Sequence, residues 1–293
     1  MGTARRGGVS LWSIVKWLLV LLLAALVFGG AAYFTYELFV KPEQRLRAEK
    51  RGDIPVEPLP DFGLEEFQAA AKLRQENRLT EARDALIHFL EKYPNGQHTE
   101  GAKDLLGDIN MEILLSDYRT PEKQEYVVRS GDVLAKIANK AKTTPEMIMR
   151  TNNLTSTMLR VGQRLLISHP DFSLFIQRKG QTVVLLDHGQ FFKRYHIQTV
   201  KLSARQPPRI NTRVAEILAF KNGKRVGFGT KEYAGSTRWI RLNQPGYFLY
   251  SEPDPAHPDE SRQPTPPGLG LAAKDVEELS GLVNGKTVVT ITD

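Results

Sequence analysis

The residue types that could perform nucleophilic chemistry lie close together near the C-terminus. Ser251 supplies a hydroxyl and His257 an imidazole, while Asp254 or Asp259 supplies a carboxylate. These are the groups of a serine, histidine and aspartate triad, but a triad is defined by side-chain geometry, which short spacing does not establish. The segment 252–267 holds six prolines and four acids, as expected of a flap or linker. We therefore predict no catalytic residue here.

Cysteine is absent from the chain, which excludes disulfides, thiolate metal sites and cysteine nucleophiles. We predict no metal site and no cofactor. The 293 residues, 41% hydrophobic and 25% charged, are typical of globular domains. This length predicts two or three folded units joined by linkers.

The formal net charge of +7 is concentrated around one apolar segment. The basic residues that flank this segment are Arg5, Arg6, Lys16, Lys41, Arg45, Arg47, Lys50 and Arg51. Such residues are attracted to anionic lipid headgroups. The cytoplasmic membrane is therefore the predicted partner of this charge, and nucleic acid is not.

The apolar segment has no charged residue from 17 to 36. About 20 such residues suffice to cross a bilayer as a helix. We predict a transmembrane helix over 17–40, preceded by a cytoplasmic tail over 1–16. A cleaved signal peptide with a small-residue site around 29–32 is the alternative, although apolar residues continue beyond that site.

A proline-rich linker is predicted over 41–62, and a helical segment over 63–118. Its helices are expected at 64–75, 79–93 and 99–116 from their apolar spacing. The stretch 73–96, with Thr80-Glu81-Ala82 and Tyr93-Pro94, resembles a tetratricopeptide-type repeat. A single repeat cannot bury its faces alone, so the resemblance implies packing on a neighbouring domain or an envelope protein. A plain helical spacer is the alternative.

The stretch 124–169 predicts the order strand, helix, helix, strand. Tyr126-Val127-Val128 is typical of a first strand and Leu165-Leu166-Ile167 of a second. Between them, Leu134, Ile137 and Ala138 form one helical face, and Thr144-Pro145 predicts the start of another helix, with Thr144 as its cap.

This stretch resembles the LysM family along the family's whole length, through Tyr-x-Val-x-x-Gly-Asp, Asn-x-Leu and Val-Gly-Gln-x-Leu-x-Ile. The resemblance implies a shallow groove for glycans that contain N-acetylglucosamine. Val133 stands where the family usually has a threonine in the first loop, so the resemblance implies the loss of one hydroxyl contact with the glycan. Asp132 and Asn153 are also interpreted as helix caps. The groove residues implied are Gly131, Asp132, Val133, Leu134, Asn153, Leu154, Leu159 and Arg160.

The remainder, 171–293, is mostly β. Strands are predicted at 174–177, 182–186, 191–197, 214–220, 225–229, 238–242, 247–250 and 286–292. Asn222-Gly223 predicts a hairpin turn. A helix is predicted at 275–283, capped by Asp275.

This part resembles the L,D-transpeptidase catalytic domain, chiefly through its final helix and strand. Active members carry a histidine-glycine pair and then Ser-His-Gly-Cys-x-Arg before that helix. Matching backward from Asp275 puts Gly268 at the cysteine and Gly270 at the arginine, with Tyr250-Ser251 near the histidine pair. The resemblance thus implies a degenerate domain, because acyl transfer needs an activated nucleophile.

Residues 201–243 hold ten Lys and Arg against Glu216 and Glu232. This stretch could attract the carboxylates of wall peptides. An ordinary solvated face is the alternative interpretation.

The sequence as a whole predicts a multidomain protein: a transmembrane helix, a tetratricopeptide-like helical segment, a LysM module and a mostly-β transpeptidase-like domain. We predict a membrane-anchored protein that binds peptidoglycan glycan strands outside the cytoplasmic membrane, in the periplasm or cell-wall space. More Lys and Arg follow the apolar segment than precede it, but large domains translocate largely regardless of such charges. The alternatives are an active cell-wall enzyme with an unrecognised nucleophile and an envelope assembly scaffold.

Overall fold

The structure is a computed structural model that describes residues 61–203, 206–253 and 264–293, together with Tyr33 and Lys41. The predicted tail (1–16), nearly all of the predicted membrane helix (17–40) and most of the linker (41–62) lie outside the described residues. Across the part of the chain that is described, no helix is both long enough and apolar enough to cross a membrane. Residues Phe62–Asp293 form one compact unit.

Three helices open this unit: α3 (Leu64–Gln75), α4 (Leu79–Lys92) and α5 (Thr99–Leu115). Their bounds agree with the predicted ones to within one residue. The apolar faces that predicted them meet in one buried cluster, which includes Leu79, Leu86, Phe89, Leu106 and Ile109.

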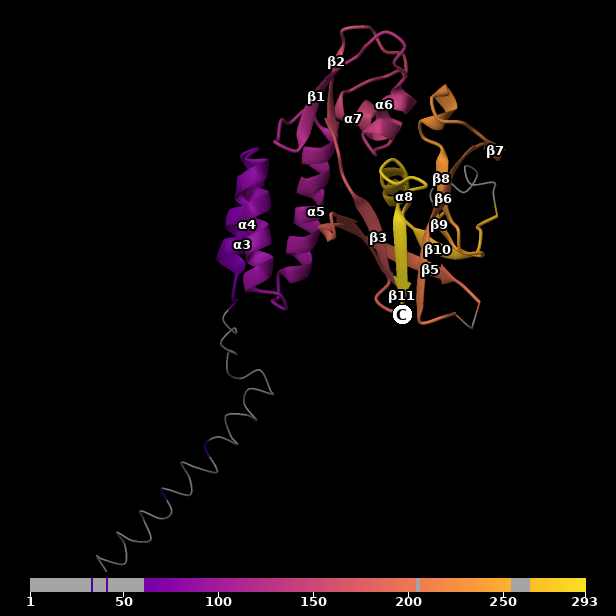
Figure 1. The fold of residues 1–293 in the computed structure, drawn as a ribbon. Coiled ribbons are helices and arrows are strands. Elements are labelled where there is room, and N and C mark those ends of the chain that lie inside the picture. Colours follow the sequence, from indigo (N-terminus) through magenta and orange to yellow (C-terminus); the bar gives the residue numbers. More distant parts are fainter. Residues whose placement is uncertain (1–32, 34–40, 42–60, 204–205, 254–263) are drawn as a thin grey trace, which may run out of the picture. The chain divides into compact units, whose positions relative to one another are not determined.

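Helix α5 packs on strand β5 (Gln190–Lys201). Gly107 allows this close approach, because a Cβ at this position would lie 2.9 Å from Cγ of Lys193. The Asn110 side chain donates a hydrogen bond of 2.8 Å to the carbonyl of Phe192. The helical segment therefore packs on a neighbouring domain, one of the two alternatives that its sequence allowed (Figure 1).

The LysM-like stretch has the predicted order β1 (Lys123–Val127), α6 (Leu134–Lys140), α7 (Pro145–Thr151) and β2 (Arg164–Ser168). The two strands pair antiparallel, with Tyr126 opposite Leu165. Thr144 caps α7 as predicted, since its hydroxyl accepts a 3.0 Å hydrogen bond from the amide of Met147. Eight buried apolar residues, among them Leu134, Ile137 and Ile148, give this unit its own core.

The C-terminal part is a closed β-barrel. The other strands are β3 (Phe172–Gln177), β4 (Thr182–Asp187), β6 (Arg209–Lys221), β7 (Lys224–Arg225), β8 (Thr237–Leu242), β9 (Phe248–Ser251), β10 (Gly268–Leu271) and β11 (Val288–Thr292). The order is β11-β3-β4-β5-β10-β9-β8-β6-β7, and β11 also pairs with β6. This last pairing closes the barrel, so that β7 alone lies outside the ring.

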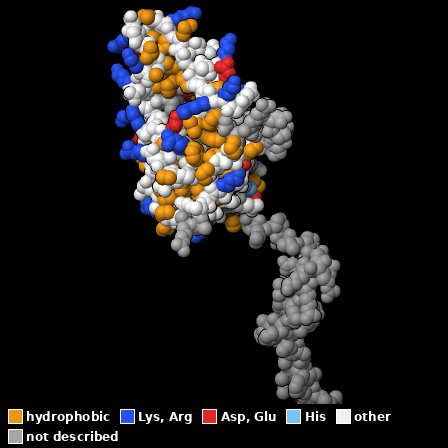
Figure 2. Space-filling model, turned by 90° about the vertical axis from the view of Figure 1, so that its right-hand side faces the viewer, with side chains coloured by type: hydrophobic (Ala, Val, Ile, Leu, Met, Phe, Trp, Pro, Cys, Tyr) orange, Lys and Arg blue, Asp and Glu red, His pale blue; other side chains and the backbone are white. Residues whose placement is uncertain are grey.

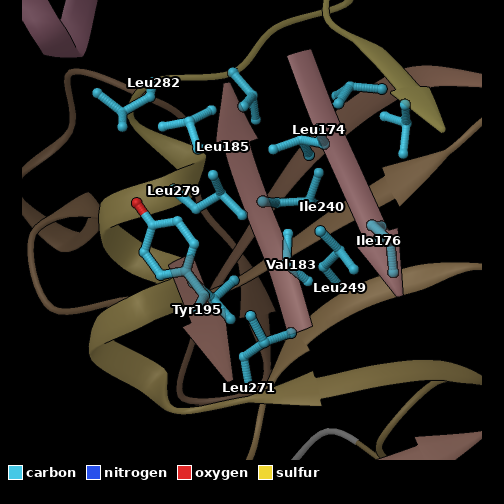
Figure 3. Packing of buried hydrophobic residues seen from close by; sticks show 14 of the residues in the cluster. Leu174, Ile176, Val183, Leu185, Tyr195, Ile240, Leu249, Leu271, Leu279 and Leu282 are labelled. Carbon is cyan, nitrogen blue, oxygen red and sulfur yellow. The ribbon is translucent and has the colours of Figure 1, made fainter. Parts of the chain in front are cut away.

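Alternating side chains fill the barrel, as the period of a strand requires. Leu174 and Ile176 of β3 point inward with Val183 and Leu185 of β4, and all four are at most 1% exposed (Figure 3). Helix α8 (Ala273–Ser280) contributes Leu279 to this core. Truncating any of these leucines to alanine is expected to cost about 2–5 kcal/mol.

Three sequence predictions in this domain were wrong in detail. Residues 225–229 are not a strand, because β7 ends at Arg225 and the chain then turns to a short 3-10 helix at Lys231–Tyr233. Strand β10 was not predicted. Helix α8 begins at Ala273, so Asp275 lies in its first turn and does not cap it. The Asn222-Gly223 turn is confirmed, with φ of 51° and 74° between β6 and β7.

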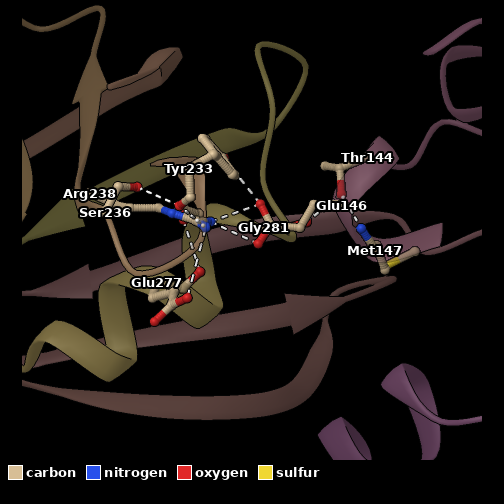
Figure 4. Close-up of polar contacts among 9 residues, drawn as sticks. Thr144, Glu146, Met147, Tyr233, Ser236, Arg238, Glu277 and Gly281 are labelled. Atoms are coloured by element: carbon tan, nitrogen blue, oxygen red, sulfur yellow. Dashed lines mark hydrogen bonds and ion pairs between the residues drawn. The ribbon is translucent and has the colours of Figure 1, made fainter. Parts of the chain in front are cut away.

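The LysM-like unit contacts the barrel through helix α7. Met147 belongs to the barrel's hydrophobic cluster, and the Thr144 hydroxyl donates to the carbonyl of Gly281. Glu146 accepts hydrogen bonds from the guanidinium of Arg238 on β8 and, at 3.1 Å, from the hydroxyl of Tyr233 (Figure 4).

Candidate functional site

The first predicted groove loop follows β1 and is held by the Asp132 carboxylate. Its Oδ2 accepts hydrogen bonds from the amide of Arg129 at 2.8 Å and the hydroxyl of Tyr126 at 2.7 Å. These two donors lower the pKa of the Asp132 carboxyl, and the same contact raises the pKa of Tyr126. Asp132 therefore orders the loop. The interpretation of Asp132 as a helix cap was wrong, because α6 begins at Leu134 after Val133.

The second predicted loop follows α7 and begins with two asparagines. Asn153 is exposed with a φ of 51°, and its backbone amide donates to the Arg150 carbonyl at 3.3 Å. Together with the amide of Leu154, which donates to the Met149 carbonyl at 2.9 Å, this left-handed turn closes the C-terminus of α7, so Asn153 caps the helix at that end. The side chain of Asn152 donates to the carbonyls of Ile148 and Leu166, and accepts from the amide of Leu166 at 2.7 Å. Asn152 was not among the predicted groove residues, yet its side chain ties the loop to β2.

The two loops are joined at their bases. The amide of Val128 donates to the Gln163 carbonyl at 2.9 Å, and the amide of Gly162 donates back to the Val128 carbonyl at 2.8 Å. Arg160 lies in the same turn, where its amide donates to Oε1 of Gln163. The structure thus brings together the loops that carry the predicted groove residues.

The predicted groove residues differ in their exposure to solvent. Gly131, Val133, Asn153 and Arg160 are exposed, whereas Leu134 is 3% exposed and belongs to the core. Leu154 and Leu159 are half-buried against that core. They support the loops from beneath.

Exposed apolar side chains mark the surface of both loops. Val133 is 50% exposed in the first loop, and Met158 and Val161 are 83% and 72% exposed in the second. Met158 and Val161 were not predicted as site residues, although apolar residues in a polar turn are a usable signal. Exposed apolar groups beside backbone amides can bind a small polar ligand that carries methyl groups.

The positions assigned to a lost transpeptidase site also lie together. Strands β9 and β10 pair in parallel, which sets Gly270 opposite Tyr250 and Leu271 opposite Ser251. Gly268 and Gly270 of β10 are both closely packed, Gly268 against the backbone of Phe248 and Gly270 against the side chain of Glu252. A Cβ on Gly268, whose φ is 141°, would lie 2.1 Å from the Phe248 carbonyl oxygen, and one on Gly270 would lie 1.9 Å from Oε1 of Glu252.

Among the residues that the structure describes at this place, none forms a pair of nucleophile and base. Ser251 is 5% exposed, and its hydroxyl donates to the Arg238 carbonyl at 3.0 Å. Burial, with a smaller effect of the Glu252 carboxylate, raises the pKa of Tyr250 to about 12. His257, Asp254 and Asp259 lie outside the described residues.

The basic stretch 201–243 does not form one continuous face. Arg238 is buried, and Glu216 pairs with both Arg225 and Arg241. Figure 2 views the molecule from the side of β6 to β10 and shows hydrophobic side chains over the middle of this face, with Lys and Arg around them. Within the described ranges, no three His, Cys, Asp or Glu residues gather as metal ligands.

Comparison with protein families identifies the first site. Residues 126–168 match the LysM domain family, so the chain contains a LysM domain. LysM domains bind peptidoglycan glycan. Comparison with curated proteins finds no match.

Among solved structures, the barrel is similar to L,D-transpeptidase domains. The enzyme from Mycobacterium smegmatis is 9% identical with a TM-score of 0.30, over 46% of this chain and 65% of that one. L,D-transpeptidase 3 from Mycobacterium tuberculosis is 15% identical with a TM-score of 0.27, over 45% and 66%. The enzyme from Stackebrandtia nassauensis is 14% identical with a TM-score of 0.28, over 42% and 56%. The chain thus spans less than two thirds of these three structures.

Proposed function

We propose that this chain is a membrane-anchored protein of the bacterial cell envelope that binds peptidoglycan through its LysM domain, with a barrel that performs no acyl transfer. The observation that carries the proposal is the LysM domain at 126–168, whose two loops meet and expose Val133 and Val161. An N-acetyl group offers a methyl for such apolar contacts and an amide for loop backbone groups.

The inactivity of the barrel is supported by the two glycines of β10. A Cβ at Gly268 would overlap the backbone of Phe248, so this position has no room for a cysteine, and a side chain at Gly270 would have to displace the Glu252 carboxylate. The buried hydroxyl of Ser251 already donates a hydrogen bond to the backbone carbonyl of Arg238.

Co-sedimentation with purified sacculi tests the binding. The full chain in mild detergent is expected to pellet with sacculi and to be released by soluble N-acetylglucosamine oligomers. A chain that stays in the supernatant contradicts the proposal.

The anchored topology rests on the uncharged residues 17–36. A C-terminal alkaline phosphatase fusion is expected to be active, because the domains that follow would lie outside the cytoplasmic membrane. An inactive phosphatase with cytoplasmic fluorescence of a matched fusion would contradict this topology.

A further inference from the structure

A cavity of about 1130 Å³ lies between the LysM domain and the barrel. One wall is the second LysM loop, with Asn153, Leu154 and residues 155–157, and the other includes Phe228 and Lys274 of the barrel. Thr157 approaches the turn that follows β7, since a Cβ on Gly229 would lie 3.4 Å from the Thr157 methyl group. The cavity is large enough for several residues of a peptide.

Arg238 forms a buried, pre-organised part of the cavity lining. Its side chain is 2% exposed, lies 4.0 Å from the Tyr233 ring centroid, and has hydrogen bonds from Nη1 to both oxygens of Glu146 at 2.8 Å (Figure 4). Its buried Nε has no hydrogen-bond partner among the described residues. A buried donor without a partner is unusual in a folded protein.

The cavity lining holds three acids, Glu146, Glu277 and Glu278, and three bases, Arg150, Arg238 and Lys274. Glu278 pairs at 2.9 Å with Lys193, which also pairs with Asp108, and Glu277 lies 3.8 Å from Arg238, which is already bound to Glu146. Arg150 and Lys274 are exposed at the lining, and neither side chain makes an ion pair or hydrogen bond with the residues that the structure describes. Two uncommitted cations therefore face any ligand that enters.

We propose that this cavity binds the peptide branch of peptidoglycan while the LysM loops hold the glycan, so that the two domains recognise one branched ligand. The inference rests on the proposed function. Continuity supports it, because Asn153 and Leu154 belong to the predicted groove and also line the cavity. The hydroxyls of Thr155 and Ser156 suit peptide amides, and Arg150 and Lys274 suit peptide carboxylates.

The test compares two ligands that share the same glycan and differ only in whether they carry peptides. A soluble peptide-bearing glycan fragment, and the same fragment after an amidase has removed its peptides, are titrated into the full chain by calorimetry in mild detergent. The wild type is expected to bind the peptide-bearing form about threefold to thirtyfold more tightly, as two exposed ion pairs allow. The variant R150A/K274A is expected to lose this preference and keep its affinity for the bare glycan.

The control variant K140A/K224A removes two exposed cations that do not line the cavity, and it is expected to keep the preference. Affinity for the bare glycan reports in each variant that the LysM domain is folded. Equal binding of both ligands by the wild type, or a preference that survives in R150A/K274A, would overturn this inference alone. Failure of the wild type to bind either ligand would overturn the proposed function as well.

Discussion

Both carboxylate oxygens of Glu146 lie 2.8 Å from Nη1 of Arg238, and this pair joins LysM helix α7 to barrel strand β8. The Arg238 side chain is 2% exposed and that of Glu146 is 15% exposed, so water screens the pair little. The contact fixes the LysM loops relative to the barrel and forms part of the cavity lining between them.

Breaking this pair should destabilise the protein strongly. Arg238→Met leaves the Glu146 carboxylate nearly buried without its partner, and we expect a loss of about 3–5 kcal/mol in the free energy of unfolding, measured by urea denaturation. Arg241→Met on the same strand removes an exposed pair with Glu216 and should cost less than about 1 kcal/mol. The double variant R238M/E146M should recover part of the loss. Equal effects of the two single variants would contradict this account.

Introducing a cysteine at Gly268 should not produce a transpeptidase. Gly268→Cys places a Cβ against the backbone of Phe248 at a φ of 141°, so we expect a loss of about 3 kcal/mol or more and no covalent adduct with a β-lactam. Gly227→Cys is the matched control, since a Cβ there meets nothing within 4 Å. Intact mass spectrometry and thermal unfolding provide the readouts. A β-lactam adduct on the wild-type chain would show that another nucleophile is active.

The exposed apolar residues of the LysM loops should control wall binding. Val161→Asp is expected to weaken co-sedimentation with sacculi about tenfold, because it replaces an apolar contact by a charge that must be desolvated. The melting temperature should hardly change, since Val161 is 72% exposed. Val288→Asp, at a 44% exposed position on the barrel, should leave binding unchanged. Similar losses in both variants would refute a specific role for the loop.

Lys123 should make stability depend on pH. Burial lowers the pKa of its ammonium to about 8, so between about pH 8 and 10.5 the unfolded chain holds a proton that the folded chain has released. Stability should therefore rise with pH across this window, by about 1–2 kcal/mol for a half-buried group. Lys123→Met should remove this rise, which urea denaturation at pH 7.5 and 10 would detect. If the free energy of unfolding changes with pH in the same way in the wild type and in Lys123→Met, Lys123 is not the group responsible.

Local sequence signals predicted much of this fold. Thr144-Pro145 predicted the start of α7, and Asn222-Gly223 the hairpin after β6, because a cap and a turn depend on neighbouring residues. Strand β10 was missed because glycine disfavours strands, and its two glycines are explained only by Phe248 and Glu252 across the sheet.

In the candidate sites, too, local patterns could be predicted from the sequence, whereas contacts between distant residues could not. The family pattern supplied the two LysM loops, but not the role of Asn152, which depends on its distance from Leu166 of β2. The pairing of Glu146 with Arg238 joins residues of separate domains, so neither periodicity nor local spacing could predict it.

Binding of an N-acetylglucosamine glycan by the LysM loops can be measured through the amide chemical shifts of the full chain during titration with an N-acetylglucosamine tetramer. We expect the perturbed amides to cluster at residues 129–134 and 153–162, with little change on β3 or β4. Absence of saturable shifts in these loops, or shifts that cluster on another surface, would contradict it.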